Sequence, residues 1–116
     1  MTSFKNTIQQ HFRYLFEEWG FEFQDVVNDY QGNIVIAQSD KLKIRFINDR
    51  ADFFLDIGGI TEMNGWVEFY KIMDMLKTKG YVHTGYKYSN KISTVSQLLN
   101  RYFFEIQKLF SVIDGK

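Results

Sequence analysis

Apolar side chains recur at spacings of three and four residues in three segments of the chain. The first stripe fills residues 3–19 and is followed directly by Gly20; the others fill residues 66–76 and 93–110. This spacing puts the apolar side chains on one face of a helix, and glycine commonly follows a helix end. The pattern predicts three amphipathic helices, with Asn64 capping the second.

Between the first two stripes the period changes to two. Apolar and polar residues alternate in four short segments, which are separated by Asn, Asp, Ser and Gly and span residues 21–27, 33–39, 42–47 and 52–57. Alternation is typical of a strand with one buried face. The connections are too short for parallel pairing, because a parallel crossover needs about a dozen residues or more. The four strands should therefore form an antiparallel meander.

The expected order of elements is α-β-β-β-β-α-α. A run of strands set apart from helices favours an α+β fold in two layers, with a four-stranded antiparallel meander and helices packed on one face. A chain of 116 residues is a usual length for one domain. We expect residues 1–116 to form a single α+β domain.

Composition excludes several classes of function. The chain has no cysteine, which removes disulfides, thiolate metal sites and cysteine nucleophiles. Its 14 basic residues balance its 14 acidic ones, whereas general nucleic-acid binding needs an excess of positive charge. The sequence shows neither a signal peptide nor a membrane span of about 20 apolar residues. We expect a soluble cytoplasmic protein that contacts no membrane.

Catalytic motifs are missing from the sequence. It lacks a Gly-x-Ser-x-Gly nucleophile motif, a phosphate-binding loop and a His-Glu-x-x-His motif. Asp52 and Asp56 lie four residues apart on one predicted strand, about 13 Å, which is too far to share a metal ion. We interpret His11 as a partly buried structural residue and find no carboxylate next to His83 in sequence. The prediction is a protein that is not an enzyme and has no catalytic residue, metal or cofactor.

Charged side chains gather on the outward face of the third and fourth strands. If Phe46 pairs with Phe53, then Lys43 lies opposite Asp56 and Arg45 opposite an exposed aromatic residue. This face is either a solvated surface with ordinary cross-strand pairs or a docking surface for a partner protein, since interfaces favour aromatic residues and arginine. The candidate partner-binding residues here are Lys43, Arg45, Asp49, Arg50, Phe54 and Asp56.

The segment Lys77–Lys91 interleaves four lysines with Tyr81, Tyr86 and Tyr88. Three interpretations fit it: a solvated connection, a protein-contact loop in which Tyr86 and Tyr88 bind the partner, or a site that stacks single-stranded bases.

A separate acidic run, made of Glu17, Glu18, Glu22, Asp25 and Asp29, is either a solvated helix end or a patch facing a basic partner such as a nuclease toxin.

The run from Leu42 to Gly58 is similar to the signature of a family of small uncharacterised bacterial proteins. The shared pattern is an Ile-Arg-Phe strand, an Asp-Arg turn and a strand ending in Asp-Ile-Gly, followed by Trp66 in a helix. The matching positions are Arg45, Asp49, Arg50, Asp56 and Gly58. The size and style of that family resemble immunity proteins, which bind and block a bacterial toxin.

These observations lead to one expected function and one alternative. We expect a non-catalytic protein-binding module, an immunity-type inhibitor of a toxin, for which a second copy of the chain is another candidate partner. The alternative is a small nucleic-acid-associated or regulatory domain that uses Lys77–Lys91. We also expect alanine at Arg45, Arg50 or Phe54 to weaken partner binding and leave the melting temperature nearly unchanged.

Overall fold

The structure is a computed structural model that describes residues 4–29, 32–49, 52–60, 65–81 and 91–113. Two short helices precede four strands, a fifth short strand and two further helices. In chain order the elements are α1 (Phe4–His11), α2 (Arg13–Glu17), β1 (Glu22–Asp29), β2 (Gly32–Gln38), β3 (Leu42–Asp49), β4 (Asp52–Gly59), β5 (Val67–Glu68), α3 (Phe69–Thr78) and α4 (Ile92–Ile113).

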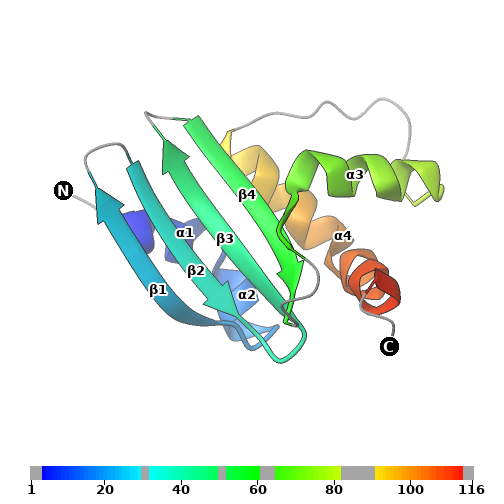
Figure 1. Cartoon of the computed structure of the whole chain (residues 1–116), viewed down its shortest axis with the longest axis horizontal. Coiled ribbons are helices and arrows are strands. Elements are labelled where there is room, and N and C mark those ends of the chain that lie inside the picture. The colour runs from blue at the N-terminus through cyan, green and yellow to red at the C-terminus, as the bar shows by residue number, and fades with distance from the viewer. Residues whose placement is uncertain (1–3, 30–31, 50–51, 61–64, 82–90, 114–116) are drawn as a thin grey trace.

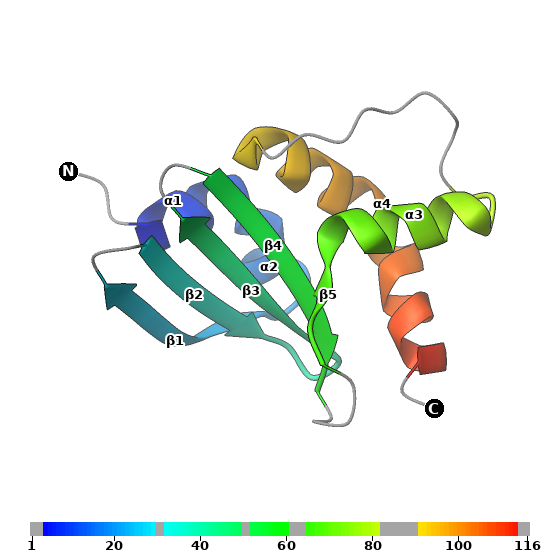
Figure 2. The ribbon, with the colours of Figure 1, turned by 45° about the horizontal axis from the view of Figure 1, so that its top comes forward.

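The strands form one antiparallel sheet in the order β1-β2-β3-β4-β5. Figure 1 shows α1, α2 and α4 behind this sheet, and Figure 2 shows α3 leaving the short strand β5 and running beside α4. The predicted α+β class, the antiparallel meander and the helices on one face are confirmed. Among the described residues, no helix is long and apolar enough to cross a membrane.

The fifth strand is the main departure from the predicted topology. Residues from Trp66 were predicted to be helical, but Val67 pairs with Ile57 and Glu68 pairs with Asp56. The helix α3 begins at Phe69, two residues after the extended segment starts. Pairing with the free edge of β4 therefore overrides the helical spacing of these residues. Asn64, the predicted cap, lies outside the described residues.

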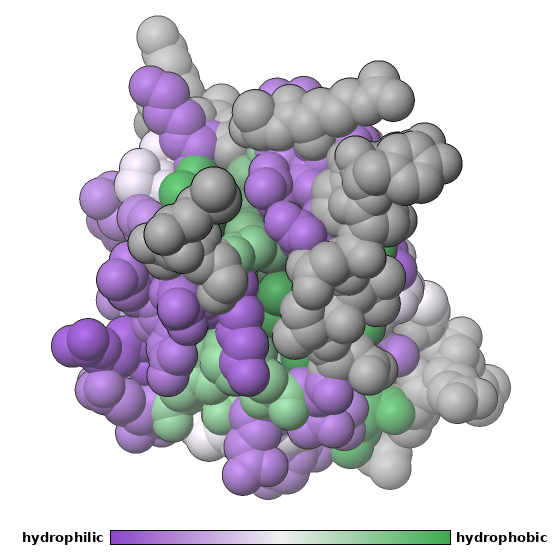
Figure 3. All heavy atoms as spheres, turned by 90° about the vertical axis from the view of Figure 1, so that its left-hand side faces the viewer, coloured by the Kyte–Doolittle hydropathy of each residue, from purple (hydrophilic) through white to green (hydrophobic). Residues whose placement is uncertain are grey.

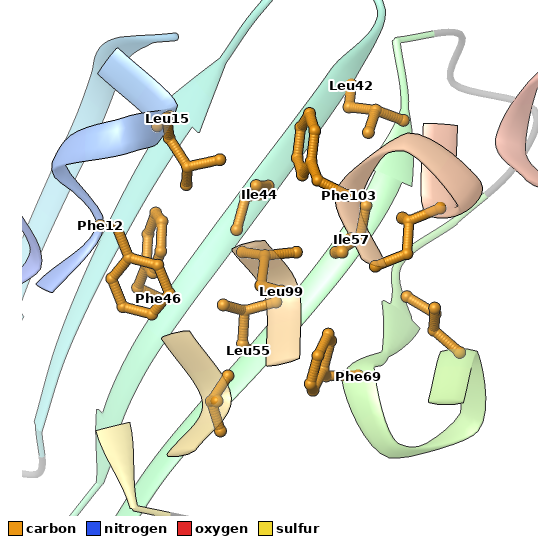
Figure 4. Packing of buried hydrophobic residues seen from close by; sticks show 14 of the residues in the cluster. Phe12, Leu15, Leu42, Ile44, Phe46, Leu55, Ile57, Phe69, Leu99 and Phe103 are labelled. Carbon is orange, nitrogen blue, oxygen red and sulfur yellow. The ribbon is translucent and has the colours of Figure 1, made fainter. Parts of the chain in front are cut away.

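Alternation along β3 and β4 builds the core. Leu42, Ile44 and Phe46 are buried on the side that faces the helices, as are Leu55 and Ile57 of β4. Figure 4 shows these side chains meeting residues from the helices. The residues of the helical layer labelled in that view are Leu15, Phe69, Leu99 and Phe103 of the helices and Phe12 between α1 and α2, all of them buried.

The predicted first helix is divided at Phe12. This residue has φ −118° and ψ 31°, and the centre of its buried ring lies 5.0 Å from the centre of the Phe46 ring. The break frees the carbonyl oxygen of His11, which accepts a hydrogen bond from the Ser96 hydroxyl. His11 itself is exposed, so the interpretation of its side chain as partly buried was wrong. Gly20 ends the segment at a positive φ of 73°, as predicted.

The long last helix follows its predicted stripe but is not straight. Val95, Leu99, Ile106 and Phe110 are buried along one side of α4. At Tyr102 the backbone leaves helical geometry, with φ −110° and ψ 16°, and Figure 2 shows the change of direction. Both halves of the stripe thereby stay in contact with the core.

A buried hydroxyl connects α2 to α4. The Tyr14 hydroxyl donates a 2.7 Å hydrogen bond to the carbonyl oxygen of Ser96. Burial raises the pKa of Tyr14 well above its ordinary value of 10.0, and hydrogen bonds involving Ser96 and Asn100 offset only part of that rise. The folded state therefore holds this proton more tightly than the unfolded chain does.

We expect this difference to weaken the fold at high pH. A group whose pKa is raised by folding contributes stability that is complete below its unfolded pKa and is lost as the pH rises above it. Tyr14→Phe should lower the free energy of unfolding by about 1 kcal/mol at neutral pH, and this deficit should shrink above about pH 10. Urea titrations of both proteins between about pH 8 and about pH 11 measure it; a deficit that stays constant would contradict the proposed titration.

Candidate protein-binding surface

One face of the sheet is not covered by any helix of the described residues, and it faces the viewer in Figure 1. Side chains that alternate with the core positions of β2, β3 and β4 lie on it. We call this surface the open sheet face. The side chains of these three strands that lie on it are Ile34, Ile36, Gln38, Lys43, Arg45, Ile47, Asp49, Asp52, Phe54 and Asp56.

An apolar row crosses the middle of the open sheet face. Ile34 pairs with Ile47, and Ile47 pairs with Phe54 on the next strand. Ile36 lies two residues further along β2 on the same side. The three isoleucines are only partly buried, and Phe54 is 38% exposed. The sequence analysis identified Phe54 and Ile47 as exposed residues of this face but missed Ile34 and Ile36. The alternation of these two with Val35 and Ala37, which are buried, already indicated that they lie on the outward side.

The predicted register between β3 and β4 was wrong by two residues. Phe46 pairs with Leu55 rather than Phe53, and Arg45 consequently pairs with Asp56. The last pair before the turn is Asp49 with Asp52, so two residues connect the strands where four were expected. A two-residue connection is the commonest one in hairpins. Because the error is an even number, every side chain keeps its predicted face.

The corrected register creates an ion pair at one end of the face. The Arg45 Nη2 atom lies 2.7 Å from Asp56 Oδ2, and the Arg45 Nε atom lies 3.1 Å from the same oxygen. Asp56 is only 6% exposed, while the Arg45 side chain is 30% exposed. A carboxylate that is so buried needs its cation. Both residues are on the predicted surface, but the charge of each is neutralised mainly by the other.

Trp66 covers this ion pair from above the sheet. The centre of its ring lies 4.6 Å from Arg45 Cζ and 4.8 Å from Lys43 Nζ. Gly58 makes room for the lysine stem, because a Cβ there would lie 2.9 Å from Lys43 Cε. Sequence reasoning placed Trp66 in a helix and missed this contact. The cations at this end are therefore held in place by an aromatic ring.

Trp66→Leu is expected to lower the free energy of unfolding by about 1–2 kcal/mol. The reason is the loss of two cation–π contacts, each worth about 0.5–1 kcal/mol at a partly exposed site. Trp66→Tyr keeps a π face and should lose less. Urea titration of the three proteins measures the difference; equal losses for leucine and tyrosine would show that the contact has no cation–π component.

The opposite end of the face is acidic. Asp49 and Asp52 are directly paired across the hairpin, and both are exposed. Like charges that face each other across strands are destabilising, so this end favours a cation. Arg50, another predicted binding residue, lies outside the described residues. The structure thus brings Lys43, Arg45, Asp49, Phe54 and Asp56 onto one face.

Most of the predicted contact loop lies outside the described residues. Tyr86, Tyr88 and His83 lie outside the described residues, and of the flanking positions Lys77, Lys79 and Tyr81 are exposed. In the acidic run, Glu17 forms an exposed 3.5 Å ion pair with Arg13 of the same helix. Glu18 and Glu22 are exposed, whereas Asp25 and Asp29 belong to the part of β1 whose side chains are outside the description.

Hollows lined by described residues also occur in the helical layer, and two of them have measured volumes. The larger, about 450 Å³, is open to solvent along α1 and α2 and is lined by amides and by the Arg13–Glu17 pair. The smaller, about 80 Å³, lies between the end of α3 and α4 beside Tyr81, Glu105 and Lys108. The described part of the chain has no group of three His, Cys, Asp or Glu side chains placed to hold a metal ion. The site that the structure builds most fully is therefore the open sheet face.

Figure 3 shows the side of the molecule next to β1, where hydrophobic surface lies between hydrophilic side chains.

Comparison of the chain with protein-family models, with curated proteins and with solved structures finds no match. The resemblance to a family of immunity-like proteins stays a prediction.

Proposed function

We propose that this protein is a non-catalytic protein-binding module that acts as an immunity-type inhibitor and occludes a toxin with its open sheet face. The observation that supports this most is the apolar row of Ile34, Ile47 and Phe54 with charged side chains at both ends. Contiguous exposed apolar surface with a polar rim is typical of protein interaction sites. Cytoplasmic location belongs to the same proposal.

Strand pairing holds the backbone of this surface in place. Each apolar residue of the row stands on a paired strand, and Trp66 holds Lys43 and Arg45 at one end. Side chains that are already ordered lose little conformational entropy when a partner docks. An inhibitor of this kind needs no cofactor and no reacting group, because covering the partner's active surface is sufficient.

The acidic end supports a basic partner. Asp49 and Asp52 are exposed and repel each other, so a lysine or arginine from a partner would relieve that repulsion. Toxins that cleave nucleic acid must attract phosphates and are therefore basic on their active surfaces. An acidic group beside an apolar row fits such a surface.

Phe54→Asp is expected to abolish capture of the partner, and Phe104→Asp is its matched control. Both phenylalanines are exposed, at 38% and 57%, but Phe104 belongs to α4 in the helical layer. A central aromatic anchor of an interface typically contributes about 2 kcal/mol or more, which is a loss of affinity of about thirtyfold. Capture is measured by pull-down from source cells together with co-expressed neighbouring gene products.

The inhibitory role has its own readout. A neighbouring gene product that arrests growth should be tolerated when this protein is co-expressed, and tolerance should be lost with Phe54→Asp but kept with Phe104→Asp. Equal behaviour of the two variants would contradict the assignment of the open sheet face. Capture of a harmless partner would retain the binding module and reject the inhibitor.

A further inference from the structure

The open sheet face carries opposite charges at its two ends. Lys43 marks one end of β3, and Asp49 marks the other, next to Asp52. Both lie on the same side of the strand, six residues apart, which is about 20 Å along an extended chain. The apolar row lies between them. A surface with this arrangement is complementary to itself once its strand direction is reversed.

We propose that a second copy of this chain docks on the open sheet face and forms a two-fold symmetric dimer. This inference rests on the part of the proposed function that makes this face a protein-binding surface. In a two-fold interface the same patch meets itself, so a contact between residue i and residue j occurs twice. With β3 strands reversed, Lys43 of each copy faces Asp49 of the other.

The centre of this arrangement combines apolar side chains with the Arg45–Asp56 pair. Phe46 is midway between Lys43 and Asp49, so the outward side chains nearest the symmetry axis are Arg45 and Ile47. The guanidinium of Arg45 is already neutralised by Asp56, which lets it approach its symmetry mate. Ile47 of each copy then faces Arg45 of the other, and Ile34 faces Ile36, because the two rows exchange places across the axis. Phe54 lies next to these contacts, opposite the Arg45–Asp56 pair of the other copy. Face-to-face sheets commonly pack with nearly aligned strands, as this geometry requires.

The shape of the face agrees with the same symmetry. Trp66 stands above the sheet beside Lys43 and Arg45, and β5 pairs only with Asp56 and Ile57 of β4. The end of one copy that carries Trp66 would therefore meet the Asp52–Phe54 part of the other. The chain's net charge of zero adds no long-range repulsion between copies. Self-association in this geometry would compete directly with a toxin.

Charge reversal in a mixture of two variants tests the inference. Lys43→Glu alone gives two like-charge contacts with Asp49, and Asp49→Lys alone gives two with Lys43, so each should weaken dimerisation at least about tenfold. When the two variants are mixed, both contacts pair opposite charges. Sedimentation velocity should therefore show two monomeric variants that form a dimer together, while the wild type is a dimer.

Melting curves confirm that each variant folds. Asp49→Lys should fold well, because the new lysine faces Asp52 and turns a like-charge pair into an opposite-charge pair. Should Lys43→Glu fail to fold, Phe54→Asp replaces it and is expected to be monomeric, while Phe104→Asp remains dimeric. A wild-type protein that stays monomeric at millimolar concentration overturns the inference, as does a mixture of folded variants that does not associate. If the wild type is monomeric and captures a different protein, and if Phe54→Asp abolishes that capture, the dimer is rejected and the proposed function is retained.

Discussion

Phe103→Ala is expected to lower the free energy of unfolding by about 3–5 kcal/mol, the usual cost of removing a buried aromatic ring. Phe103 has no exposed surface, and its ring centre lies 4.5 Å from that of Trp19 and 5.8 Å from that of Phe21. These contacts tie α4 to the segment between α2 and β1. The total free energy of unfolding of a domain of this size is about 5–15 kcal/mol, so the substitution removes a large fraction of the stability.

The next residue on the same helix provides the control. Phe104 is 57% exposed, and Phe104→Ala should change the free energy of unfolding by no more than about 0.5–1 kcal/mol. Guanidinium chloride titrations of the two variants measure this contrast. Comparable losses at both positions would contradict the assignment of Phe103 to the core side of α4 and of Phe104 to its solvent side.

Arg45→Ala is expected to lower the free energy of unfolding by about 3 kcal/mol, because it leaves the buried Asp56 carboxylate without its cation. Asp56→Ala should cost less, about 2 kcal/mol, since the partly exposed guanidinium can be hydrated once its partner is gone. This result would correct the expectation from sequence that alanine at Arg45 leaves the melting temperature nearly unchanged.

A double-mutant cycle separates the ion pair from the packing of its stems. The Arg45→Ala/Asp56→Ala protein should be more stable than the sum of the single losses predicts, by about 1–2 kcal/mol. Lys43→Ala is the matched control, because this lysine contacts the same Trp66 ring but has no ion pair among the described residues. Strict additivity of the two substitutions would contradict a direct pair.

Periodicity in the sequence was enough to predict the layers of this fold. Buried positions such as Ile44 in β3 and Leu99 in α4 recur with periods of two and about 3.6, and the burial of these residues confirms both patterns. The same alternation correctly assigned Lys43 and Phe54 to the outward side of the sheet. Local patterning of this kind depends on residues close in sequence, which a single chain displays directly.

Long-range pairing was harder to predict. The hairpin could be closed by two or four residues without changing any side chain's face, so the contact between Arg45 and Asp56 could not be read from alternation. Trp66 lies 21 residues after Arg45 along the chain. Its helical spacing hid its contact with the ion pair. The break at Phe12 likewise depends on Ser96, which is more than 80 residues away.

Photo-crosslinking at two positions tests the central claim, that the open sheet face is where this protein binds other proteins. A photoreactive phenylalanine analogue replaces either Phe54 on the open face or Phe104 on the helical layer, and the source cells are irradiated. We predict a discrete crosslinked product from position 54 only, at twice the mass of the chain if a second copy is bound. Products from position 104 alone, or from neither position, would contradict the claim.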